Sequence, residues 1–222
     1  MAIIPIDIIS DVICPWCFIG YRTLQKAISL YRKTYPGASK DEFRIEWKPY
    51  FIDQVPPEDS LLVNDRMSRR MKPSQVLAAQ TRLKRVGKSV GIEFRFGGSI
   101  GSSRLAHRAL YFAFQNEGSE IQCALAEVLF KYQFEMERDV SLLDVLVEAA
   151  VEAELDESVV REYLEGEGGK EEVEEEQRRA RDMGIKGVPC FVVGDGAAKE
   201  MIDGAGDMEE FFGAFVKARG SA

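Results

Sequence analysis

The first fifty residues contain two segments with the apolar pattern of a strand and, between them, one segment with helical spacing. Residues 3–9 are rich in isoleucine and end at a Ser-Asp pair, which is typical of a buried strand that runs into a loop. From residue 15 to about residue 35, apolar side chains recur at helical spacing until a Pro-Gly pair closes the segment. Residues 43–51 alternate apolar and polar side chains with a period of two. These patterns predict a strand, a helix and a second strand.

Helical periodicity then dominates from about residue 55 to residue 165. One apolar stripe consists of Ile121, Leu125, Val128, Leu129 and Tyr132. Ser141 and Asp144 have the spacing of a capping box that would open one helix, and Asp156 is placed as the N-cap of the next. We therefore expect a block of several helices here.

The last part of the chain predicts a charged helix followed by two strands and a helix. In residues 170–183 acidic side chains lead and basic ones trail, and the i,i+4 spacing predicts the ion pairs Glu174–Arg178 and Glu175–Arg179. Gly184 would end this helix. Residues 190–193 and 199–202 predict strands joined by a Gly-Asp-Gly turn, and residues 207–218 predict a terminal amphipathic helix. The whole pattern predicts one mixed α/β domain with a helical insertion.

Composition and charge exclude several classes of protein. The chain has 222 residues, of which 45% are hydrophobic and 30% charged, as in globular domains. A formal net charge of −8 argues against nonspecific binding to nucleic acid or to anionic membranes. No apolar run approaches the roughly 18 residues of a membrane span, and the N-terminus lacks the positively charged start of a signal peptide. We therefore expect a cytoplasmic protein without a membrane span.

One segment differs from this acidic background. Between Arg66 and Lys88 the chain carries eight basic residues and no acidic one. Such a run is usually a solvated helix face, but it would also attract an acidic partner or a carboxylate-bearing substrate.

Two of the four cysteines stand in a Cys-Pro-Trp-Cys motif, Cys14-Pro15-Trp16-Cys17, at the start of the first predicted helix. The unpaired N–H groups and the dipole of a helix N-terminus favour a thiolate on Cys14, which makes it the expected nucleophile. Cys17 lies one turn further on, where it can attack a mixed disulfide on Cys14. A zinc site would need a second pair of ligands, and the remaining His107, Cys123 and Cys190 do not form one. The motif therefore favours dithiol redox chemistry.

The segment from Ser10 to Gly20, which contains this motif, and the distant segment Gly184-Ile185-Lys186-Gly187-Val188-Pro189 resemble the DsbA-like thioredoxin-fold family, and within it the FrnE-like dithiol-disulfide oxidoreductases. The resemblance spans nearly the whole chain. A segment around His107 also resembles the family's helical domain, with Ser102-Ser103 where the family usually has Asn-Thr.

The resemblance implies an α/β, thioredoxin-like fold with an inserted helical domain. Residues 1–54 and 166–222 would form the thioredoxin-like domain, and residues 55–165 the insertion. It also implies that Cys14 and Cys17 are catalytic and face a cis-proline loop at Val188-Pro189, where an extended substrate can pair with the backbone. Pro15 and Trp16 would shape the substrate surface, with packing as the alternative role of Trp16.

The resemblance further implies a disulfide- or thiol-containing protein or small-molecule substrate, with glutathione as a candidate co-substrate and no metal or organic cofactor. Two other functions stay open. The 2-hydroxychromene-2-carboxylate isomerases and kappa-class glutathione transferases share this fold, but they typically carry serine at the position of Cys14. A noncatalytic redox sensor, with the dithiol as its switch, is the second alternative.

The remaining titratable and nucleophilic side chains carry weaker expectations. His107 is the only histidine, so acid-base chemistry near neutral pH would fall on it first, although a structural or surface role is favoured. Cys190 follows Pro189 directly, and on a strand it is expected to point into the core as an inert thiol, with a third redox-active thiol as the alternative. Cys123 is expected to be a packing residue on its helix, without a chemical role.

Overall fold

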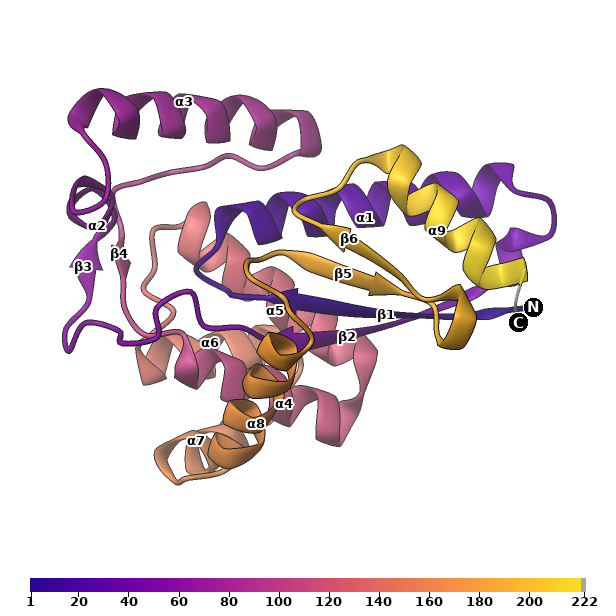
Figure 1. Ribbon diagram of the computed structural model, residues 1–222. Coiled ribbons are helices and arrows are strands. Elements are labelled where there is room, and N and C mark those ends of the chain that lie inside the picture. Colours follow the sequence, from indigo (N-terminus) through magenta and orange to yellow (C-terminus); the bar gives the residue numbers. More distant parts are fainter. Residues whose placement is uncertain (221–222) are drawn as a thin grey trace.

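A four-stranded mixed sheet with the strand order β2-β1-β5-β6 runs through the computed structural model, which describes residues 1–220 (Figure 1). Its strands are β1 (Ile3–Ser10), β2 (Glu42–Pro49), β5 (Cys190–Val193) and β6 (Glu200–Asp203). β1 pairs with β2 in parallel and with β5 antiparallel, and β5 pairs antiparallel with β6. The sheet therefore joins the first fifty residues to the last thirty, as the strand patterns predicted.

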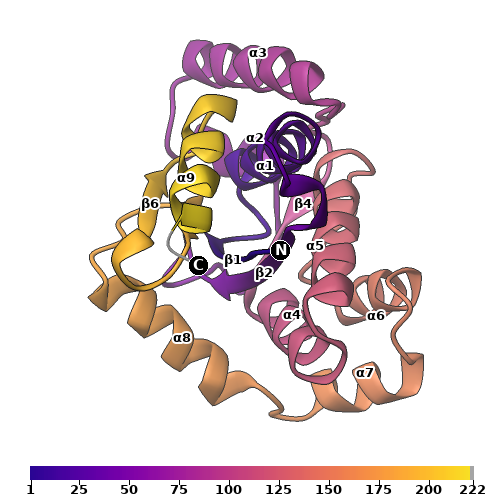
Figure 2. The same cartoon turned by 90° about the vertical axis from the view of Figure 1, so that its right-hand side faces the viewer.

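Helices cover both faces of this sheet (Figure 2). α1 (Pro15–Thr34) and α9 (Met208–Gly220) lie on one face, and α8 (Lys170–Asp182) lies on the other. Ile4, Ile6 and Ile8 alternate along β1 with half-buried residues, and all three are buried in the main apolar core. The alternation of side chains with a period of two therefore reflects a strand with one face buried beneath helices.

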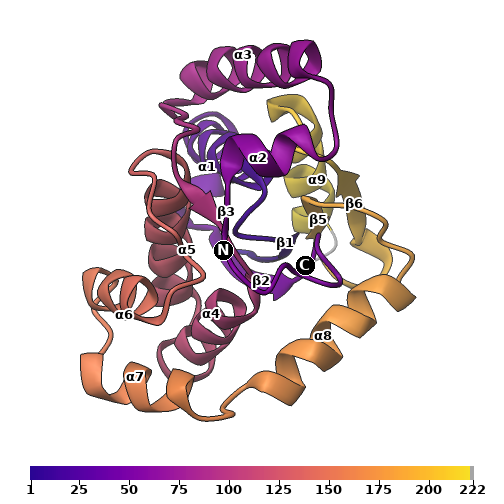
Figure 3. The same ribbon diagram turned by 90° about the vertical axis from the view of Figure 1, so that its left-hand side faces the viewer.

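The middle of the chain forms the expected helical block (Figure 3). Its helices are α2 (Val63–Ser68), α3 (Pro73–Val90), α4 (Arg104–Glu117), α5 (Ser119–Phe134), α6 (Leu143–Glu152) and α7 (Glu157–Glu165). Two short antiparallel strands, β3 (Leu61–Leu62) and β4 (Ser99–Ile100), were not predicted, because two residues are too few to show a period. Single turns of 3-10 helix lie at Ala38–Lys40 and Gly196–Ala198.

Phe18 connects the sheet and the helical block through one apolar core. It projects from α1 and is fully buried. Its ring stacks on Phe130 of α5 at a centroid distance of 5.2 Å and lies 6.4 Å from the rings of Phe94 and Phe134. The helix that begins at the cysteine motif is therefore held against α5 by aromatic packing.

Arg108 fixes the connection between α7 and α8. Its buried guanidinium donates to the carbonyl oxygens of Tyr163 at 2.9 Å, Gly166 at 2.7 Å and Gly168 at 2.7 Å. These carbonyls belong to the C-terminal turn of α7 and to the following loop, where no intrahelical donor is available. One side chain of α4 thus supplies the missing hydrogen bonds.

Two local predictions in the helical segments are wrong. Ser141 does not open a capping box, because α6 begins at Leu143 and the Ser141 hydroxyl donates instead to Asp139 at 2.6 Å. Glu174 pairs with Arg104 of α4, so Arg178 pairs with Glu175 rather than with Glu174.

Other local predictions are confirmed. Asp156 caps α7 by accepting the Val159 N–H at 3.0 Å, and Glu175 pairs with Arg179 at 2.9 Å. Within residues 1–220, no helix combines the length and the apolar character needed to cross a membrane.

Candidate functional site

The two motif cysteines lie at the first turn of α1, next to the end of β1. Cys14 is the N-cap residue in an extended conformation, and Pro15 occupies the first helical turn, where a missing N–H costs no hydrogen bond. The Cys17 N–H donates to the Cys14 carbonyl at 3.1 Å. Both side chains are free thiols. The local sequence therefore places both sulfurs in the first turn of one helix.

The two thiols differ in their surroundings. Cys17 is completely buried, whereas Cys14 keeps 5% of its surface exposed. Burial raises the pKa of the Cys17 thiol well above its ordinary value, and the neighbouring Cys14 raises it further. Cys17 therefore stays protonated at neutral pH until its surroundings change.

A loop from the far end of the sequence lies against Cys14. The peptide bond between Val188 and Pro189 is cis. The Cys14 thiol donates to the Val188 carbonyl across 3.6 Å, although 174 positions separate the two residues. The pairing of β1 with β5 produces this contact, because it aligns the end of β1 with the start of β5. Three of the expected site residues, Cys14, Val188 and Pro189, thus meet at one edge of the fold.

Trp16 lies half-buried between the cysteines and contacts the basic segment. The guanidinium of Arg82, on α3, lies 4.8 Å from the centre of the Trp16 ring, within the range of a cation–π contact. Arg66 and Arg70 of the same segment pair with Asp53. Three arginines of the basic run therefore have contacts within the protein, and one of them, Arg82, packs on the Trp16 ring.

The sequence analysis did not predict a buried contact between Asp11 and His107 near the cysteine motif. The carboxylate of Asp11 is fully buried and accepts the Ile52 N–H at 2.8 Å and the Ile13 N–H at 3.3 Å. Nε2 of His107 lies 3.6 Å from the same carboxylate, so the two groups form an ion pair whenever the ring is protonated. His107 is therefore buried, and the surface role is excluded. The only sequence signal was that Asp11 directly follows a buried strand.

Replacing Asp11 with asparagine is expected to lower the free energy of unfolding by about 1–3 kcal/mol. The amide keeps the size of the carboxylate, but its NH2 group meets a buried donor and leaves that donor unpaired. Urea denaturation of Asp11→Asn, beside Asp59→Asn at an exposed position, measures the difference. Equal transition midpoints for Asp11→Asn and the wild type would contradict this role.

The other two cysteines lie in different environments. Cys190 is completely buried on β5, in a small apolar cluster with Ile9, Tyr50 and Val192. Burial raises its pKa to about 12, with a contribution from Asp203. Cys123 is half-buried on α5, where the Trp47 ring N–H lies 3.4 Å from its sulfur. The prediction that Cys190 points into the core is confirmed.

We expect Cys190→Ala to leave the redox behaviour of the protein unchanged. A buried thiol with a raised pKa has almost no thiolate at neutral pH, and the substitution removes one buried sulfur. The variant should lose about 1 kcal/mol of stability and retain wild-type rates of disulfide turnover and the same sensitivity to peroxide. A slower turnover with an intact fold would show that Cys190 takes part in the reaction.

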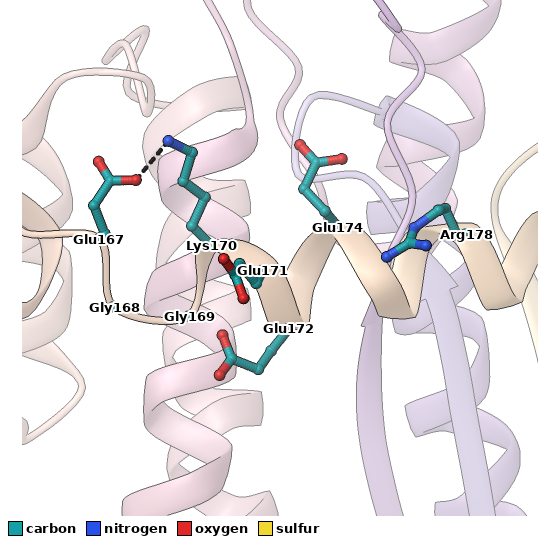
Figure 4. A pocket seen from close by; sticks show the side chains of 8 residues that line it. All are labelled: Glu167, Gly168, Gly169, Lys170, Glu171, Glu172, Glu174 and Arg178. Atoms are coloured by element: carbon teal, nitrogen blue, oxygen red, sulfur yellow. Dashed lines mark hydrogen bonds and ion pairs between the residues drawn. The ribbon is translucent and has the colours of Figure 1, made fainter.

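The surface also carries a hollow that is remote from the thiols. It lies at the start of α8 and is lined by one continuous segment, which includes Gly168, Gly169, Glu171 and Glu172 (Figure 4). No cysteine lines it, and its side chains are those of glutamate, lysine and arginine, which do not carry out thiol chemistry. In the described part of the chain, His, Cys, Asp and Glu side chains form no cluster of three or more that could hold a metal ion.

Comparisons with known proteins agree with this geometry. A family model described as DSBA-like thioredoxin domain matches residues 5–216. The chain is 26% identical to the uncharacterized protein YwbO of Bacillus subtilis (strain 168) over 194 residues, which cover 86% of each chain. Among solved structures, it resembles a probable DsbA oxidoreductase, SCO1869, from Streptomyces coelicolor, with a TM-score of 0.84, 28% identity and coverage of 99% of this chain and 91% of that one.

A more distant neighbour is the cytosolic disulfide reductase DsbM from Pseudomonas aeruginosa, with a TM-score of 0.60, 17% identity and coverage of 98% and 96%. A second structure of DsbM was determined with GSH and gives a TM-score of 0.58, 15% identity and coverage of 98% and 96%. At these identities the likeness concerns the fold.

Proposed function

The chain belongs to the DsbA-like thioredoxin domain family, and from this premise we propose that it is a thiol-disulfide oxidoreductase that works through Cys14 and Cys17. Members of this family are disulfide oxidoreductases or isomerases, which supports an enzymatic activity. The observation that carries the finer proposal is the placement of Cys14 and Cys17 in the first turn of α1, with the Cys14 thiol 3.6 Å from the Val188 carbonyl.

In the reductive direction, the Cys14 thiolate attacks one sulfur of a substrate disulfide. The sulfur–sulfur bond of the substrate breaks, one substrate thiol leaves and takes up a proton, and a mixed disulfide joins Cys14 to the other half. Cys17 then loses its proton and attacks the Cys14 sulfur, which releases the second substrate thiol. The two electrons gained by the substrate come from the dithiol, which ends as a Cys14–Cys17 disulfide. The oxidative direction is the reverse of these steps.

Three features of the site support these roles. Cys14 is the N-cap residue of α1, at the positive end of the helix dipole. Cys14 is the more exposed of the two cysteines, so a substrate reaches it first. The Val188 carbonyl offers a backbone acceptor beside Cys14, where an extended substrate segment can pair.

The second step should depend steeply on pH. Because burial raises the pKa of Cys17, little of it is thiolate at neutral pH. We expect the release of a substrate bound to Cys14 to accelerate about tenfold for each pH unit between pH 6 and 8, as the thiolate fraction rises. Stopped-flow release of a fluorescent thiol from the mixed disulfide measures this rate. A rate independent of pH would contradict a Cys17 that must first lose its proton.

The proposed cycle uses only the two thiols and a sulfur substrate, without a metal or organic cofactor. Glutathione is a suitable co-substrate, since it would return the oxidised pair to the dithiol and itself become a disulfide. A related fold, that of DsbM, has been determined with GSH. We further propose a cytoplasmic site of action, in which the glutathione pool is largely reduced.

The proposal is tested by turnover of a small disulfide, bis(2-hydroxyethyl) disulfide, with reduced glutathione as electron donor and a coupled assay for oxidised glutathione. Repeated turnover that requires both Cys14 and Cys17 is the expected result. A protein that forms the Cys14–Cys17 disulfide reversibly but fails to turn over would be a redox sensor. A glutathione-dependent isomerisation or conjugation that persists in a Cys17→Ser variant, without formation of oxidised glutathione, would favour an isomerase or transferase.

A further inference from the structure

The segment that packs beside the cysteine motif is strongly basic. Residues 61–96, which include α2 and α3, carry nine basic and two acidic side chains, whereas the whole chain has a net charge of −8. α3 packs against α1, the helix that begins at the motif (Figure 3). The fold therefore places a basic segment next to the dithiol of an otherwise acidic protein.

Most of these cations have no carboxylate partner. Arg66 and Arg70 pair with Asp53, but in the part of the chain that the structure describes the other seven basic side chains of the segment form no ion pair. All seven are exposed. Elsewhere in the chain, most lysine and arginine side chains pair with a carboxylate. The positive charge beside the motif is therefore not neutralised by the protein itself, and it attracts anions.

Arg82 places one of these charges on the motif itself. Its guanidinium lies 4.8 Å from the centre of the ring of Trp16, which stands between Cys14 and Cys17 in the sequence. Among the described residues, the Arg82 side chain forms no hydrogen bond and no ion pair. A guanidinium can stack on an aromatic ring and still donate two parallel N–H bonds to a carboxylate. Arg82 is thus held near the dithiol with its donors available.

Three further arginines lie near the motif. Arg66, Arg70 and Arg95 line one cavity together with Ile13 and Pro15. The ion pairs of the first two with a single carboxylate neutralise only part of their charge. An anion that approaches the start of α1 therefore meets positive charges from α2, from α3 and from the segment that follows α3.

We propose that Arg82, together with the unpaired cations around it, recognises a carboxylate, and that the substrates of the site are disulfides with a carboxylate close to their sulfur atoms. This inference rests on the proposed function, because it names the class of substrate for the same site. Arg82 binds the carboxylate and takes no part in the electron transfer. The substrate disulfide gains two electrons and leaves as two thiols, while the Cys14–Cys17 disulfide forms.

The test measures how fast the reduced protein loses its motif thiols to 3,3′-dithiodipropionate, bis(2-hydroxyethyl) disulfide or cystamine, in the absence of glutathione. These disulfides share a two-carbon spacer and have anionic, neutral and cationic ends. Each rate is divided by the rate of the same disulfide with 2-mercaptoethanol, which corrects for intrinsic reactivity. We expect the corrected rate to be at least about tenfold higher for the anionic than for the cationic disulfide at low salt. Most of this preference should be lost at about 0.5 M NaCl.

Three variants locate the site. Arg82→Glu should lower the ratio of the anionic to the cationic rate by at least about fivefold. Arg178→Glu changes the net charge equally, at an arginine in the hollow remote from the thiols, and should retain the wild-type ratio. Arg82→Lys keeps the charge and should retain most of the preference, whereas a purely structural role on Trp16 would change all three rates alike. Thermal unfolding of each variant shows that it is folded.

A binding experiment tests the recognition of anions without redox chemistry. In octanedioate and 1,6-diaminohexane, methylene groups replace the sulfurs of dithiodipropionate and cystamine. Ligand-observed NMR compares the two compounds on the Cys14→Ser/Cys17→Ser double variant. We expect octanedioate to bind at least about threefold more tightly, and the addition of Arg82→Glu to remove this difference.

Equal corrected rates for the three disulfides, a higher rate for cystamine, or an equal change of the ratio in Arg82→Glu and Arg178→Glu would each overturn the inference. A protein that reacts with all three disulfides equally refutes the recognition of charge and leaves the proposed function standing. A protein that reacts with none of them, but whose double serine variant binds octanedioate through Arg82, supports the anion site and refutes the redox function. Failure of both experiments overturns both proposals.

Discussion

Substitution of Cys14 by serine is expected to reduce disulfide turnover by a factor of at least about 10³, because an alcohol is almost never ionised at neutral pH and cannot form a disulfide. Cys17→Ser should behave differently. Its Cys14 can still attack a substrate disulfide, but no second thiol of the protein is in place to release the product. In the absence of glutathione, the variant should accumulate a mixed disulfide at Cys14 that is detected by intact-mass spectrometry.

Cys123→Ser is the matched control for these variants, since it makes the same chemical change at a half-buried sulfur away from the motif. It should turn over at nearly the wild-type rate. Turnover that survives in Cys14→Ser, or a mixed disulfide that forms on Cys123 instead of Cys14, would contradict the assignment of the nucleophile.

Truncation of Phe18 to alanine is expected to lower the free energy of unfolding by about 3–5 kcal/mol, the largest loss of stability that we expect from one side chain near the site. The ring is fully buried, stacks on Phe130 and contacts the rings of Phe94 and Phe134. Its loss leaves a cavity between α1 and the helical block, so the end of α1 that carries the cysteines should also become less rigid. Urea denaturation measures the stability change.

Phe18→Leu, which keeps most of the apolar volume, should lose less than about 1.5 kcal/mol. Phe112→Ala, at a half-buried ring that contacts Tyr163, provides a second comparison and should lose about half as much as Phe18→Ala. A Phe18→Ala variant as stable as Phe112→Ala would show that aromatic packing does not connect the two parts of the protein.

Most of the elements followed from local patterns in the sequence. β1 is nearly all isoleucine on its buried face, and α1 has a proline at its start and a helical stripe through Tyr31, so both were predicted within one or two residues. Asp156 was recognised as an N-cap because this hydrogen bond reaches only three residues along the chain. Features of this kind depend on neighbours in sequence.

The failures involve competition from partners that the helical spacing does not include: one lies 70 positions away in the sequence and the other two positions away. Glu174 had a suitable partner one turn away at Arg178, but Arg104 of α4 lies within 3.1 Å and takes its place. Ser141 had the spacing of a capping residue, but the nearby carboxylate of Asp139 accepts its hydroxyl. Helical periodicity contains no information about such alternatives.

The same distinction applies to the site. The spacing of Cys14 and Cys17 was sufficient to suggest their chemistry, because both lie in one helical turn. The contact between His107 and Asp11 joins α4 to the end of β1, and that between Arg82 and Trp16 joins α3 to α1. Each depends on how the helical block packs against the sheet, which no local pattern reports.

Formation of a disulfide between Cys14 and Cys17 is the central claim, and a glutathione redox titration with thiol trapping and peptide mapping tests it most directly. The account predicts that two of the four thiols disappear together, that they map to Cys14 and Cys17, and that the midpoint lies in the range of the family and thioredoxin, between about −120 and −270 mV. Absence of a Cys14–Cys17 disulfide at every glutathione ratio would contradict the account.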